Sequence, residues 1–123
     1  MGVGNVEVVS ARAETWTAGR EACELVTARA VAPLPVLVEY AAPLLTLGGA
    51  LVAWKGAPDA GEEADGAAAG RILGLQEAER HVVPPREGAD HRHLYLYLKV
   101  RETPNGYPRR PGIARKRPLQ AST

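Results

Sequence analysis

The sequence predicts an α/β protein built on a mostly parallel β-sheet with one antiparallel strand at its edge. Along the 123-residue chain, short apolar runs rich in β-branched residues alternate with segments whose apolar residues recur every three or four positions. Such alternation favours a parallel sheet, because each helix carries the chain back across it. The last two strands are joined by a proline- and glycine-containing loop too short for a crossover helix, so they are expected to pair antiparallel.

The first half of the chain is predicted to hold three strands and a helix. The strands are expected at 5–10, 24–30 and 50–55, with a polar short helix or loop at 15–24. The third strand is nearly all apolar, which is typical of a strand covered on both faces. The helix is expected to begin between Pro33 and Pro35, where the missing N–H costs nothing, and to end at Pro43 and the Gly48-Gly49 pair.

The second half is predicted to hold a helix and the two antiparallel strands. The helix is expected at 58–73, weakened by Gly66 and Gly70. The strands are expected at 79–83 and 93–101. The second of them alternates strictly, with Leu94, Leu96, Leu98 and Val100 on one face and Tyr95, Tyr97, Lys99 and Arg101 on the other.

Composition and charge restrict the class of protein. A hydrophobic content of 46% allows a core, and a single cysteine excludes a disulfide scaffold or a multi-cysteine zinc site. The chain shows neither an apolar run of transmembrane length nor a secretory signal, which favours a cytoplasmic location. All 14 acidic residues precede position 107, whereas the tail at 107–123 carries five Lys and Arg. A cationic tail favours an anionic partner, nucleic acid first; the alternative is a solvated basic terminus.

Polar residues follow the strands that are expected to be parallel. Arg12 and Glu14 follow the first strand, Arg29 ends the second and Lys55 ends the third. Because ligands bind beyond the carboxyl ends of the strands in such sheets, we expect these residues to lie along one functional rim.

Several segments together resemble one known family. The runs SARAE, LVTARAVAPLPVLVEYAAPLL, GGALVAWKG and YPRRPGIARKRPL occur in this order between Asn5 and Leu119. They resemble the RsmG family, also called glucose-inhibited division protein B, whose members methylate guanine N7 of small-subunit ribosomal RNA with S-adenosylmethionine.

The resemblance implies a partial Rossmann-like class I methyltransferase fold. The glycine-rich turn and the acidic strand end of the family are not found here, so the chain is expected to correspond to the C-terminal half. Residues 1–106 would belong to the methyltransferase domain, and 107–123 would form a basic tail that contacts RNA.

The resemblance also implies the residues that bind the cosubstrate S-adenosyl-L-methionine. Ala13 and Glu14 match the family's adenine pocket, and Arg29 matches its cosubstrate-binding arginine, which would hold the methionine carboxylate or an RNA phosphate. The alternatives are that Glu14 caps a helix or is simply exposed, and that Arg29 forms a structural ion pair with Glu24 or Glu39.

A second set of residues is expected to contact RNA. It comprises Lys55, Tyr107, Arg109, Arg110, Arg115, Lys116 and Arg117. Prolines in the tail favour an extended shape whose cations follow phosphates, with Tyr107 stacking on a base. The alternatives are a solvated Lys55 at the end of its strand and a tail that packs as a strap across the sheet edge.

The proposed reaction requires no catalytic acid, base or metal from this chain. Guanine N7 has a free lone pair and no proton to lose, so catalysis consists of positioning. His91 and His93 lack a third ligand and are not expected to bind metal. The alternative functions are a non-enzymatic RNA- or ribosome-binding fragment and an inert remnant without a stable fold. An unpaired strand edge favours self-association.

Overall fold

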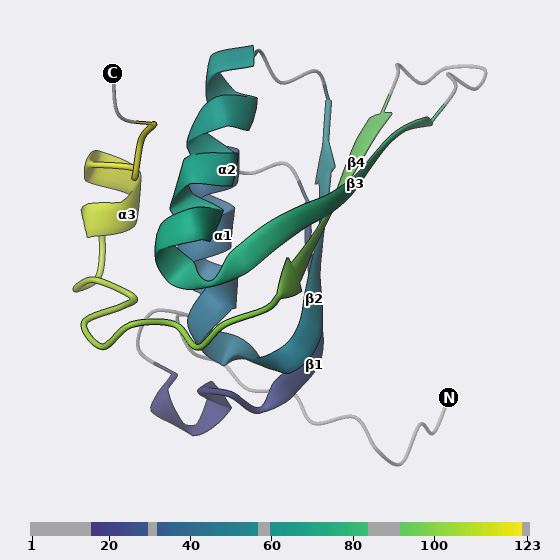
Figure 1. Ribbon diagram of the computed structural model, residues 1–123. Coiled ribbons are helices and arrows are strands. Elements are labelled where there is room, and N and C mark those ends of the chain that lie inside the picture. Colours follow the sequence, from purple (N-terminus) through teal and green to yellow (C-terminus); the bar gives the residue numbers. More distant parts are fainter. Residues whose placement is uncertain (1–15, 30–31, 57–59, 84–91, 122–123) are drawn as a thin grey trace, which may run out of the picture.

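The computed structural model describes residues 16–29, 32–56, 60–83 and 92–121, and it shows one sheet with helices against one face (Figure 1). The strands are β1 (Cys23–Arg29), β2 (Leu45–Lys55), β3 (Leu75–Val83) and β4 (Arg92–Lys99). The helices are α1 (Leu34–Ala41), α2 (Ala60–Leu73) and the short α3 (Ile113–Lys116). The expected strand at 5–10 lies outside the described residues. Within them, no helix is long and apolar enough to cross a membrane.

The sheet has the predicted mixture of strand directions. Its order is β1-β2-β4-β3, with β1 parallel to β2 and β4 antiparallel to both of its neighbours. The α/β class and the antiparallel final pair are therefore confirmed. The prediction that the antiparallel strand forms the edge of the sheet is wrong, because β4 lies between β2 and β3, and β3 forms the edge. After α2 the chain forms β3 one strand position away from β2. Strand β4 then runs back antiparallel and fills the position between β2 and β3.

Strand β2 begins five residues earlier than predicted. Helix α1 ends at Ala41 and is followed by a short 3-10 turn, so the Gly48-Gly49 pair does not terminate the helix. The pair instead lies in an irregularity of β2, where the pairing with β1 moves from Cys23–Leu45 directly to Leu25–Ala50. Gly48 has a φ of 83°, a left-handed conformation that glycine adopts without a steric penalty.

The two faces of the sheet are very different. On the helix-covered face, Tyr95 and Tyr97 of β4 are at most 1% exposed and belong to the core. On the other face, Leu25 and Trp54 are 59% and 39% exposed, and Leu98 is 38% exposed. Figure 1 shows α1, α2 and α3 on the same side of the sheet. The alternation of the last strand is confirmed, but among the described residues β2 is covered on one face only.

Lys99 is a buried cation on the helix-covered face. Its side chain is 2% exposed, and Nζ donates hydrogen bonds to the carbonyl oxygens of Ala42, at 2.9 Å, and Leu45, at 2.7 Å. Burial lowers the pKa of Lys99, because the charged form loses hydration. The lysine therefore ties the end of β4 to the turn between α1 and β2.

Candidate functional site

The carboxyl ends of β1 and β2 meet at one edge of the sheet, as the sequence predicts. Arg29 pairs with Trp54 in the parallel ladder, and Lys55 is the next residue of β2. Arg29 and Lys55 therefore share the expected rim. Arg12, Ala13 and Glu14 lie outside the described residues, so their place on this rim stays a prediction.

Lys55 is held by the protein rather than solvated. On the helix-covered side its Nζ donates to the carbonyl oxygen of Ala32, at 2.9 Å, and forms an ion pair with Glu62 Oε2, at 2.7 Å. The same carboxylate oxygen accepts from the backbone N–H of Leu34, at 2.9 Å. These contacts attach Ala32 and the start of α1 to the first turn of α2, a structural role for Lys55 that the sequence did not predict.

Arg29 lies on the opposite face of the sheet from Lys55. Its lateral neighbour Trp54 alternates with the buried Ala53, so both Arg29 and Trp54 point to the uncovered face, and Arg29 is exposed. Glu39, one of the two carboxylates considered as its partner, is bound by Arg109. Within the described parts of the chain, Arg29 forms no ion pair, and its side chain is exposed at the rim.

The tail is folded onto the helices. Tyr107 packs against the core, and its carbonyl oxygen accepts a hydrogen bond from Arg20 Nη1 at 2.8 Å. Arg109 binds Glu39 of α1, and Ala114 of α3 is 2% exposed. The predicted extended shape is therefore wrong, because the tail contains the helical turn α3 and packs against the core. The alternative of a strap across the sheet edge is also wrong, because the tail binds α1.

The last described residues return to the N-terminal ends of α1 and α2. Leu119 packs against the core, and the N–H of Ala121 donates to Asp65 Oδ1 at 2.9 Å. Here the tail and the two helices form an open pocket of about 420 Å³. Its lining includes Pro33, Pro35, Glu62, Asp65, Pro118 and Gln120. The tail thus ends close to the helix starts that follow β1 and β2.

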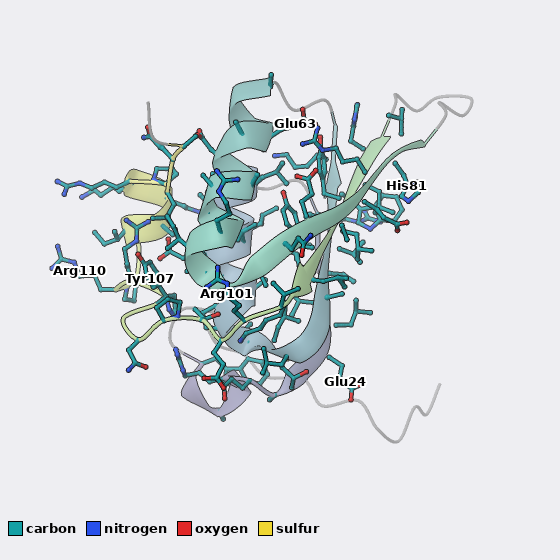
Figure 2. The ribbon with its side chains drawn as sticks, in the orientation of Figure 1. Glu24, Glu63, His81, Arg101, Tyr107 and Arg110 are labelled. Carbon is teal, nitrogen blue, oxygen red and sulfur yellow. The ribbon has the colours of Figure 1, made fainter. Side chains whose placement is uncertain are left out.

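The predicted RNA-contacting cations fall into two groups. Arg109 is only 25% exposed at its side chain and is engaged with Glu39. Four cations on the tail are exposed: Arg110, Arg115, Lys116 and Arg117. Figure 2 shows Arg110 pointing away from the body of the protein. The exposed four form the candidate nucleic-acid surface, which we call the cationic tail surface.

A polar cluster between α2 and the β3–β4 pair was not singled out from the sequence. The hydroxyl of Tyr95 donates to Glu63, and Arg80 contacts Glu63 and Glu77. Burial raises the pKa of Tyr95, and its hydrogen bond to Glu63 adds to the effect. Tyr97 is buried, and its hydroxyl has no hydrogen-bond partner among the described residues. The strict alternation of β4 places both tyrosines on one face, and this pattern could have indicated the cluster from the sequence.

No group of three potential metal ligands occurs within 16–29, 32–56, 60–83 and 92–121.

Comparison with known proteins gives consistent matches. A family model described as "rRNA small subunit methyltransferase G" matches residues 1–94. The ribosomal RNA small subunit methyltransferase G of Geobacillus kaustophilus is 40% identical over 98% of this chain and 52% of its own length. The proteins of the same name from Rubrobacter xylanophilus and Symbiobacterium thermophilum are 42% and 47% identical, over 98% and 92% of this chain and 48% and 47% of their own lengths. The chain thus spans about half the length of these curated relatives.

A solved structure supports the fold. The crystal structure titled "antibiotic-resistance methyltransferase Kmr" superposes with a TM-score of 0.55, covering 69% of this chain and 56% of that one. At 13% identity the likeness concerns the fold alone. It confirms a partial class I methyltransferase fold.

Proposed function

This chain belongs to the rRNA small subunit methyltransferase G family, and we propose that it contributes to methyl transfer from S-adenosylmethionine to guanine N7 of small-subunit ribosomal RNA. The observation that carries the proposal is the match to the curated relatives across 98% of the chain at about 40% identity. The names of these relatives support the substrate class. The guanine N7 target and the methyl donor follow from the family resemblance.

The residues present fit part of a cosubstrate site. S-adenosylmethionine would supply the electrophilic sulfonium methyl group. Arg29, exposed at the end of β1, offers a planar set of donors suited to the carboxylate of the cosubstrate. We propose that Ala13 leaves room for the adenine ring and that Glu14 accepts from its amino group. No proton has to leave N7, so the task of these residues is to hold the reacting atoms in line.

The Lys55–Glu62 pair supports this assignment indirectly. It anchors Ala32 and Leu34, three and five residues beyond Arg29, to the first turn of α2. These contacts hold Ala32 and Leu34 in place beside α2. We propose that the pair keeps the rim preorganised, and that any contact of Lys55 with RNA is secondary to this role.

Methyl incorporation into unmodified small-subunit ribosomal RNA tests the enzymatic proposal. The chain is assayed alone and joined to the preceding half of the Geobacillus kaustophilus relative, with labelled S-adenosylmethionine. We expect incorporation by the joined protein. Arg29→Met is expected to raise KM for the cosubstrate about 10- to 100-fold, because a hydrogen bond to a charged group is worth about 1.5–3 kcal/mol. Arg71→Met, an exposed arginine on α2, is the matched control. No incorporation by the joined protein with Arg29 intact would refute the proposal.

The alternative is a non-enzymatic RNA-binding fragment, and the cationic tail surface favours it. Its four exposed cations would displace counterions from RNA phosphates, so binding would weaken with salt. A filter-binding titration of the chain alone is expected to give a log–log salt slope of about −3 if all four take part. Binding that is absent or insensitive to salt would exclude this function.

A further inference from the structure

A charged residue is buried where α1 is otherwise almost entirely apolar. Glu39 is 0% exposed, and the α1 positions 34 to 38 around it are Leu, Pro and Val residues that are also buried. A buried carboxylate is costly unless it is paired and hydrogen-bonded. The partner of Glu39 therefore explains why an acid is tolerated at this position.

Arg109 satisfies this carboxylate from three of its own nitrogen atoms. Its backbone N–H donates to Glu39 Oε2 at 2.9 Å, and its Nε lies 3.0 Å from the same oxygen. Its Nη2 donates to Glu39 Oε1 at 2.7 Å. The hydrogen bond to Glu39 raises the pKa of Arg109, so the guanidinium keeps its charge. The planar guanidinium makes a two-point contact that lysine cannot reproduce.

Arg109 also closes the tail upon itself. Its Nη2 donates a second hydrogen bond, to the carbonyl oxygen of Arg117 at 2.8 Å. Arg117 directly follows α3, so one guanidinium holds both ends of the segment 109–117 and attaches it to α1. The four residues of the cationic tail surface belong to this closed segment and are exposed, and Figure 2 shows Arg110 pointing outward.

We propose that Glu39 is a positioning residue that acts through Arg109 to hold the cationic tail surface in the shape that binds RNA. Arg109 itself then contacts the protein and not a phosphate. The inference rests on the proposed RNA-binding role of the tail. A preformed set of cations binds with less loss of conformational entropy than a flexible tail of the same charge.

The direction in which one substitution changes the RNA affinity distinguishes this role from simple electrostatics. Glu39→Gln removes a negative charge near the cationic tail surface, so charge alone predicts tighter RNA binding. Loss of the clamp predicts weaker binding. Glu24→Gln removes the same charge from an exposed position on β1, and Figure 2 shows Glu24 and Arg110 on different sides of the molecule. This control is expected to bind RNA no more weakly than the unaltered chain.

A second substitution keeps the net charge of the tail and removes the two-point contact of the guanidinium. Arg109→Lys preserves the net charge of the tail, but one ammonium group cannot span both Glu39 and the Arg117 carbonyl as the guanidinium does. We expect Glu39→Gln and Arg109→Lys each to weaken RNA binding about tenfold. The double variant is expected to lose little more than either single variant, because both remove the same contact.

The experiment uses the full 123-residue chain and a fragment of small-subunit ribosomal RNA. Filter binding over about 50 to 200 mM salt gives the affinities. Limited trypsin digestion at Arg115 and Lys116 reports whether the tail is ordered, and far-UV circular dichroism confirms that each variant is folded. Faster cleavage of the tail together with weaker RNA binding, in both variants and not in Glu24→Gln, is the expected result.

Three outcomes would count against the proposals, and they differ. An unchanged cleavage rate in both variants overturns the clamp, because the tail is then ordered without it. Faster cleavage with unchanged or tighter RNA binding overturns the link between tail order and RNA recognition. Absence of salt-dependent RNA binding by the unaltered chain refutes the RNA-binding role of the tail, and the positioning role with it. If Glu39→Gln does not fold, Arg109→Lys alone tests the proposal. The side chain of Arg109 is partly exposed, so its substitution disturbs the core less than that of the buried Glu39.

Discussion

Gly70 lies in the last turns of α2, where the chain turns back into β3. A Cβ atom at this position would lie 2.5 Å from the carbonyl oxygen of Leu75, and Cβ atoms essentially never come within 3.0 Å of such an atom. The substitution Gly70→Ala therefore requires α2 and the start of β3 to separate by about 0.5 Å. Neither atom can rotate away, because the backbone fixes the position of the Cβ atom and the carbonyl oxygen is itself a backbone atom.

Two effects of opposite sign determine the result. Helix propensity favours alanine over glycine by about 1 kcal/mol, whereas overpacking of a close contact costs about 1–3 kcal/mol. The clash is with backbone, so we take the upper part of that range and expect a net loss of about 1–2 kcal/mol in the free energy of unfolding. For a chain of this size the melting temperature falls by about 5 °C per kcal/mol, and hence by about 5–10 °C.

Thermal unfolding followed by circular dichroism measures this shift. The control is Gly56→Ala, because a Cβ at Gly56 meets nothing within 4 Å. Its effect is expected to stay within about 0.5 kcal/mol. If Gly70→Ala instead melts at or above the temperature of the unaltered chain, helix propensity outweighs the contact, and the reasoning about close approach of α2 and β3 is refuted.

Three further predictions follow from buried groups and from the open face. Lys55→Met is expected to lower the free energy of unfolding by about 2–3 kcal/mol in urea titrations, because it removes the largely buried ion pair with Glu62 and the hydrogen bond to the Ala32 carbonyl oxygen; a loss below about 0.5 kcal/mol would contradict this. Burial raises the pKa of Tyr95 and of Tyr97, so the folded state keeps protons that the unfolded state loses above about pH 10. Stability is therefore expected to fall with rising pH above this value, and Tyr97→Phe to reduce the fall; equal alkaline slopes would argue against it. Leu98, on the uncovered sheet face, is expected to promote self-association, which Leu98→Lys should reduce in sedimentation; an unchanged mass distribution would count against this surface.

Periodicity in the sequence predicted the helices α1 and α2 and the four described strands, although β2 and β3 begin earlier than expected and α3 was not predicted. The alternation across 93–101 predicted a strand with two different faces, and the structure places Tyr95 and Tyr97 in the core on one of them. Pairing of this strand with its predecessor was also predictable, because the connecting loop is short. The place of β4 inside the sheet was not, since strand order depends on which neighbour offers free backbone groups rather than on local sequence.

The glycines show why local rules mislead at particular positions. Gly66 and Gly70 weaken a helix when considered alone, and Gly48-Gly49 is typical of a helix end. In the structure, a Cβ at Gly66 would lie 2.9 Å from both the Leu34 side chain and the Tyr97 hydroxyl, so this glycine allows close packing of α2. Gly48 instead supplies a left-handed conformation within β2. Each of these roles depends on a neighbour that is distant in sequence.

The amino-acid sequence by itself determined the family, the α/β class and the two groups of charged residues, because these depend on motif, spacing and composition. Only the tertiary structure decided which charges are available. It sends Arg29 and Lys55 to opposite faces of the sheet, and it assigns Arg109 to Glu39, 70 positions away. The physical reason is that a charge excluded from water must find its partner in three dimensions, whereas the sequence orders residues only along the chain.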